Sequence, residues 1–100
     1  MNESYLTDFL DTAYQLQRGE FFSENHENNL NELGRKFPDI PTVVQDQLYR
    51  FTITLDTQAK DSAKRISLGL ISPEDAEAEL SVTFRYFSPK VIKFAIEWNS

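Results

Sequence analysis

Hydrophobic side chains recur along most of this chain at the spacing expected of α-helices. In residues 3–18 they fall on one face, and the opposite face is polar. Gly19 follows Arg18, which is typical of a helix C-terminus because glycine tolerates left-handed geometry and a cation offsets the helix dipole. The pattern predicts a helix over residues 3–18. Its inward positions are Tyr5, Leu6, Phe9, Leu10, Ala13, Tyr14 and Gln17.

A second helix is predicted over residues 24–33. Ser23 followed by Glu24 is typical of a helix N-terminus, where a hydroxyl caps the first turn and an acid suits the dipole. The other residues of this segment are mostly Asn and Glu, and asparagine is a mediocre helix former, so the helix should depend on packing. Gly34 and residues 38–41 are expected to end it. The inward stripe is His26, Leu30, Leu33 and the trailing Phe37.

A long third helix is predicted from Pro41 to about Leu68. Apolar residues repeat there at spacings of three and four, as on one helix face. Residues 51–55 also alternate and are rich in β-branched and aromatic side chains, which is typical of a strand. The helix is favoured because its stripe continues on both sides of that window. The stripe is Val44, Leu48, Phe51, Leu55, Ala59, Ala63 and Ile66.

The C-terminal third begins with a strong helix start. Gly69 closes the third helix, Ser72 is a suitable N-cap and Pro73 a suitable first residue, so a fourth helix should run to Phe87 and stop at Ser88 and Pro89. Residues 90–98 alternate like a strand and also fit a short helix, so periodicity leaves this segment open.

These elements predict a single domain over residues 1–100 that is mainly α. Two helical hairpins packed as a four-helix bundle would account for the two similar helix restarts after glycines, with an ambiguous C-terminal segment added. The alternative is an α+β fold with strands near 50–56, 81–87 and 90–98.

Composition narrows the class of protein. The 100 residues hold 16 acidic and 10 basic side chains, a net charge of −6, and this argues against nucleic acid as the direct ligand. No cysteine is present, which excludes disulfides and thiolate metal sites. The N-terminus does not resemble a signal peptide, and no apolar run is long enough for a membrane span. A soluble, cytoplasmic protein is expected.

Candidate chemistry is sparse, so we expect neither an enzyme nor a bound cofactor or metal. His26 is the only histidine, and it lacks a partner at metal-ligand spacing. The three glycines are isolated, so there is no phosphate-binding loop. Lys60, Lys64 and Arg65 form a basic cluster, but Asp56 and Asp61 precede Lys60 and Arg65 by four residues and should neutralise most of it by ion pairing.

The acidic excess is unevenly distributed. Residues 1–34 contain seven acids and one base, whereas residues 35–100 contain nine of each. An acidic surface with aromatic anchors suits a basic protein partner, although the same distribution is also typical of a solubilising surface. The candidate partner-binding residues are Asp8, Asp11, Glu20, Phe21, Phe22, Glu24, Glu27 and Glu32.

The run Arg18-Gly19-Glu20-Phe21-Phe22-Ser23-Glu24 lies between two short helices. With the small size, the acidity and the lack of cysteine, it resembles small acidic bacterial immunity proteins, the antidotes to colicin D and to contact-dependent nuclease toxins. The resemblance implies a helical, non-catalytic inhibitor whose acids occupy the basic cleft of a toxin nuclease and mimic nucleic-acid phosphates.

Two other functions fit the sequence. One is a regulatory or adaptor protein that binds through an apolar face, for example as a homodimer using Tyr86, Phe87 and Trp98. The other is a phage-encoded acidic inhibitor of a host nucleic-acid enzyme. Neither reading calls for a membrane.

Overall fold

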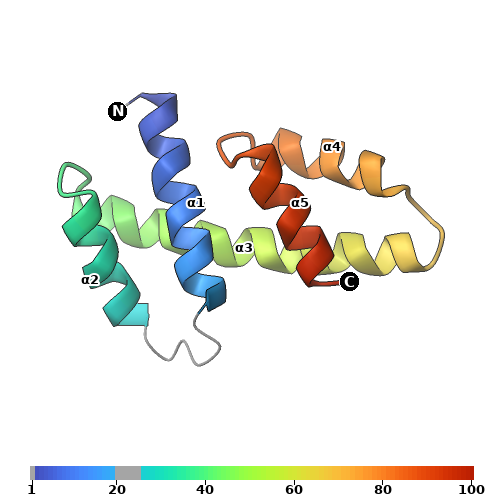
Figure 1. Cartoon of the computed structure of the whole chain (residues 1–100), viewed down its shortest axis with the longest axis horizontal. Helices are drawn as coiled ribbons and strands as arrows, with labels where there is room; N and C mark the ends of the chain where they lie inside the picture. Colours follow the sequence, from blue (N-terminus) through green and yellow to red (C-terminus); the bar gives the residue numbers. More distant parts are fainter. Residues whose placement is uncertain (1, 20–25) are drawn as a thin grey trace. The chain divides into compact units, whose positions relative to one another are not determined.

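The computed structural model describes residues 2–19 and 26–100, and its regular structure in these ranges is entirely α-helical (Figure 1). The mainly-α prediction is confirmed. No described residue lies in a strand, so the alternative strands near 50–56, 81–87 and 90–98 are wrong. The helices are α1 (Glu3–Gly19), α2 (His26–Lys36), α3 (Thr42–Ser67), α4 (Pro73–Thr83) and α5 (Pro89–Trp98). Among them, none combines the length and the apolar character needed to cross a membrane.

The chain divides into two compact units, and the boundary between them lies near the middle of α3. Residues 1–53 form one compact unit and residues 54–100 another, which we call unit 1 and unit 2. In unit 1, α1 packs against α2, and in unit 2, α4 packs against α5. The core of unit 1 is an aromatic and aliphatic cluster of Phe9, Ala13, Leu33, Phe37, Ile40 and Tyr49.

The two shorter helices of unit 1 and their connection follow the sequence only in part. The predicted cap of α2 at Ser23 lies outside the described residues. At the other end, Gly34 does not terminate α2, because the helix continues to Lys36 and the Phe37 N–H still donates to the Leu33 carbonyl at 2.8 Å. A Cβ added to Gly34 would meet only Gln45 Oε1, at an ordinary 3.7 Å, so no steric conflict requires glycine there.

The long helix α3 is confirmed, but its most buried positions are not all apolar. Gln45, Tyr49 and Thr52 are buried, whereas Val44 and Leu48 of the predicted stripe are only partly buried. These polar groups all have hydrogen-bond partners, as burial requires. For example, the Thr52 hydroxyl donates to the Tyr49 carbonyl at 2.6 Å.

The end of α3 is a glycine-dependent turn. Gly69 has a positive φ of 73°, which is the left-handed region that favours glycine. The Leu70 N–H donates to the Arg65 carbonyl at 2.9 Å and the Gly69 N–H to the Ile66 carbonyl at 3.0 Å. This pair of bonds is a Schellman motif, and it satisfies carbonyls that the helix end leaves open.

Both helices of unit 2 that follow begin with the same device. The Ser72 hydroxyl accepts the Asp75 N–H at 3.1 Å, and the Ser88 hydroxyl accepts the Val91 N–H at 3.2 Å, each before a proline at the first helical position. The expected N-cap at Ser72 is confirmed. However, α4 ends at Thr83 rather than at Phe87, and the open segment 90–98 is helical as α5.

Candidate protein-binding surface

The negative charge of the chain belongs mainly to unit 1. Residues 1–53 contain nine acidic and four basic residues, a net charge of −5, and residues 54–100 contain seven and six, a net charge of −1. The division into compact units therefore keeps the asymmetry predicted from the sequence. It also adds Asp39 and Asp46 to the acidic side and Arg35, Lys36 and Arg50 to the basic side.

Two of the predicted partner-binding residues lie on one face of α1. Asp8 is exposed and Asp11 partly exposed, one turn apart, and the opposite face buries Phe9 and Ala13. The amphipathic pattern of α1 thus directs both carboxylates away from the core. Like charges one turn apart on a helix repel each other slightly.

Glu27 and Glu32, on α2, have different surroundings. Glu27 is exposed in the first turn, where an acid suits the helix dipole. Glu32 forms ion pairs with Arg35 and with Lys36, the latter at 3.7 Å. The hydrogen bond and the charge of Arg35 lower the pKa of Glu32 below its ordinary value. Glu32 is therefore largely compensated, and a charge count that stops at residue 34 misses both of its partners.

We use the name acidic surface for Asp8, Asp11 and Glu27. Glu27 does not lie next to Asp8. The Asn29 amide contacts the Leu16 carbonyl at 3.5 Å, which places the start of α2 near the C-terminal half of α1. Asp8 is eight residues, about 12 Å of helix, before that point. The remaining predicted residues, Glu20, Phe21, Phe22 and Glu24, lie outside the described residues.

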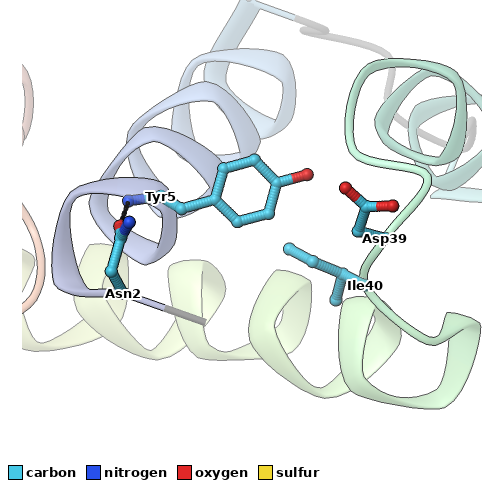
Figure 2. Close-up of a pocket in the computed structure, with 4 residues that line it drawn as sticks. All are labelled: Asn2, Tyr5, Asp39 and Ile40. Carbon is cyan, nitrogen blue, oxygen red and sulfur yellow. Dashed lines mark hydrogen bonds between the residues drawn. The ribbon is translucent and has the colours of Figure 1, made fainter.

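A pocket of about 440 Å³ adds one acid that sequence reasoning missed (Figure 2). Asn2, Tyr5, Asp39 and Ile40 line it, and the Tyr5 hydroxyl and the Asp39 carboxylate point toward one another. The Asn2 side-chain oxygen accepts the Tyr5 N–H at 2.8 Å, which caps α1. The hydroxyl and the carboxylate offer acceptors to a donor of a partner, and counting charges by compact unit would have included Asp39.

A buried glutamine positions the connector that carries Asp39. The Gln45 side chain is 3% exposed, and its amide donates to the carbonyls of Phe37 at 3.0 Å and Ile40 at 2.8 Å. Both carbonyls belong to the turn between α2 and α3, where the Ile40 N–H also donates to the Phe37 carbonyl at 3.2 Å. Gln45 therefore fixes the geometry of this turn.

The apolar face proposed for an adaptor differs from the expectation. Phe87 is 3% exposed because it packs edge-to-face on Phe84, with ring centroids 5.9 Å apart, so it is not available to a partner. Trp98 is 44% exposed and stacks on Phe94, which is 45% exposed, at a centroid distance of 5.8 Å. The spacing of four residues on a helix would have identified this pair, had the segment been assigned as helical.

The basic cluster of α3 is only partly neutralised. The Asp61–Arg65 ion pair is confirmed at 3.3 Å, and Arg65 also binds Glu79 at 2.6 Å, which raises the pKa of Arg65. The expected Asp56–Lys60 pair is absent from the part of the chain that the structure describes. Asp56 instead accepts the Asn99 amide at 3.0 Å, a contact that brings the end of α5 to α3 within unit 2.

Neither a search for metal-ligand clusters nor a comparison with known proteins points to a particular function. Within residues 2–19 and 26–100, no group of three or more His, Asp or Glu side chains could hold a metal ion. The side chain of His26 lies outside the described set. Comparison of the chain with protein-family models, curated proteins and solved structures finds no significant match to any of them.

Proposed function

We propose that the chain is a non-catalytic inhibitor that binds a basic protein partner through the acidic surface of unit 1. The observation that carries this proposal is the net charge of −5 on residues 1–53, with Asp8 and Asp11 displayed on one face of α1. Carboxylates held on a helix can occupy positions that a basic cleft provides for phosphates. Opposite potentials also accelerate the encounter of two proteins.

The most specific form of the proposal is an immunity protein that neutralises a toxin nuclease. It rests on the resemblance of residues 18–24 to such proteins, with Phe21 and Phe22 as aromatic anchors beside the acids. In this proposal the protein is cytoplasmic, requires no cofactor, and carries its acids on its first two helices. A phage-encoded inhibitor of a host nucleic-acid enzyme would use the same acidic surface, and the identity of the partner separates the two.

The test reverses charge on α1 and compares a variant with the same net charge. Asp8→Lys with Asp11→Lys changes the acidic surface, whereas Glu77→Lys with Glu97→Lys makes the same change in unit 2. The wild-type chain, immobilised, is used to retain a partner from a bacterial lysate, and the partner is then identified and purified. Association rates are measured by surface plasmon resonance at low and high salt, after circular dichroism has confirmed that each variant is helical.

We expect the association rate to fall at least about tenfold for the α1 variant and with added salt, and to change little for the unit 2 variant. A nuclease partner should also lose its activity when the chain is present in equal amount. Equal association rates for wild type and the α1 variant would contradict the proposal. A partner without nuclease activity would support inhibition or regulation of another kind.

An adaptor function is the second candidate, favoured by the exposed Phe94–Trp98 stack. Exposed aromatic pairs are typical of interface centres, because they bury a large apolar area when a partner covers them. Binding through this pair should be insensitive to salt. Self-association that is lost in Trp98→Ala, measured by analytical ultracentrifugation, would favour this function and a homodimer.

A further inference from the structure

Unit 2 has a pocket of about 580 Å³ beside the second half of α3. Ala63, which is buried, and Ile66, which is partly buried, are among its lining residues, so part of the lining is apolar. The end of α5 closes one side, where the Asn99 amide bonds to Asp56 of α3. We call this pocket the α3 groove. Its lining residues on α3 are Thr57, Lys60, Asp61, Ala63, Lys64, Ile66 and Ser67.

Two lysines, Lys60 and Lys64, are among the residues that line the α3 groove. Lys60 and Lys64 are exposed and lie one turn apart on the same face of α3. Neither ammonium group pairs with a carboxylate among the residues that the structure describes. The nearby acid Asp61 is engaged by Arg65 at 3.3 Å. The lining of the groove therefore combines apolar side chains with two cations that have no ion-pair partner among the described residues.

We propose that the α3 groove binds an acidic amphipathic segment of a partner protein. An apolar side chain of that segment would cover Ala63 and Ile66, and carboxylates beside it would pair with Lys60 and Lys64. An amphipathic helix laid in a groove is a common mode of peptide recognition, with apolar anchors at helical spacing. Nucleic acid fits this groove less well, because two lysines beside apolar side chains match neither the charge density of the phosphates nor the polar edges of the bases.

This binding site is distinct from the acidic surface. The α3 groove lies on unit 2, whereas the acidic surface lies on unit 1. The groove would select an acidic partner, whereas the acidic surface would select a basic one. Loss of binding in the α3 groove would leave the proposed inhibition through Asp8 and Asp11 untouched, so each proposal can fail without the other.

The experiment is a titration of the full chain followed by backbone amide shifts in nuclear magnetic resonance. The probe is a synthetic peptide of about three helical turns, with leucines along one face and glutamates beside them. The comparison peptide has lysines in place of the glutamates. Lys60→Gln with Lys64→Gln removes the cations of the groove, and Lys90→Gln with Lys93→Gln makes the same change on the exposed side of α5.

We expect saturable shifts at Ala63, Ile66 and their neighbours with the glutamate peptide. Affinity should fall about tenfold in the Lys60 and Lys64 variant, the effect of losing two exposed ion pairs, and stay within twofold in the α5 variant. Equal binding of the lysine peptide, an equal loss in both variants, or no saturable shift would overturn the proposal. Octanoate is titrated as well, and binding as tight as that of the peptide would show a small-molecule site and overturn it too.

Discussion

Replacing Gln45 with leucine should destabilise unit 1 more than any other single polar substitution that we consider. The change keeps side-chain size while removing the amide that donates to the carbonyls of Phe37 and Ile40. Both acceptors lie in the turn that carries Asp39 and one wall of the Tyr5 pocket. The variant thus tests whether a buried polar side chain, rather than apolar packing alone, holds this turn.

The expected cost follows from the hydrogen bonds. Two bonds at 3.0 and 2.8 Å are lost, each worth about 1 kcal/mol net. The Phe37 carbonyl keeps a second donor, the Ile40 N–H at 3.2 Å, but no other hydrogen bond to the Ile40 carbonyl is found among the described residues. The lost bond to the Phe37 carbonyl should therefore cost about 1 kcal/mol, and the unsatisfied Ile40 carbonyl about 1–3 kcal/mol. Together these give an expected loss of about 2–4 kcal/mol in the free energy of unfolding. For a chain of this size that lowers the Tm by roughly 10 °C or more.

Urea unfolding followed by circular dichroism measures this loss, and amide hydrogen exchange locates it. Exchange should accelerate at the amides of Phe37, Asp39 and Ile40 before it does elsewhere in the variant. Gln47→Leu is the matched control, because Gln47 is exposed on the same helix and the same chemical change there should stay within about 0.5 kcal/mol. If Gln45→Leu behaved like Gln47→Leu, the assigned role of the buried amide would be refuted.

Two further predictions concern a helix cap and an ion pair. Ser72→Ala should cost about 1 kcal/mol in the free energy of unfolding by urea, because it removes the acceptor of the Asp75 N–H. The control Ser81→Ala, within α4, should cost nothing. An unchanged stability in Ser72→Ala would contradict the cap. Glu32→Gln should lower the Tm slightly at pH 7, because a folded pKa below the unfolded value of about 4.3 stabilises the fold above that pH. That difference should vanish as the pH falls through the folded pKa, and a difference that persisted at pH about 2 would show that it does not come from the charge of Glu32.

Much of the helical structure could be predicted from local signals. The apolar stripe of α3, the Ser72 cap and the left-handed Gly69 each depend on residues within one or two turns. The sequence leaves the secondary structure of residues 90–98 open because this short apolar segment fits both the helical and the strand period. The pair Ser88 and Pro89 repeats the pair Ser72 and Pro73 and starts a helix in the same way, so it marks the start of α5 as well as the end of the preceding segment.

The buried polar residues were harder to predict because their partners are distant in sequence. Gln45 binds carbonyls five and eight residues away, and the Asn29 amide donates to the Tyr49 hydroxyl across 20 residues at 2.9 Å. A pattern of apolar residues assigns such positions to the surface, since it records hydrophobicity and not the availability of a partner. For this reason the predicted stripe of α3 runs beside the residues that are most buried in unit 1.

Charge patterns predicted the uneven distribution of acids along the chain better than they predicted individual ion pairs. The excess on the first part of the chain survives division into compact units, because it depends only on composition. The pairing of Lys60 with Asp56 did not, since spacing of four permits an exposed ion pair worth only a few tenths of a kcal/mol. The Asn99 amide, which no helical spacing could reveal, occupies Asp56 instead.

The absence of the expected Asp56–Lys60 pair among the described residues changes how the net charge of −6 is interpreted. If Asp56 had neutralised Lys60, Lys64 would have been the only lysine lining the α3 groove without an ion pair among the described residues. With Asp56 bonded to Asn99, the chain carries an acidic surface on unit 1 and an available pair of cations beside an apolar groove on unit 2. Salt weakens attraction at both places, so salt dependence alone cannot assign a partner to either. Charge substitutions can, because those at Asp8 and Asp11 and those at Lys60 and Lys64 alter opposite signs on separate units, and a partner that responds to one set identifies its binding surface.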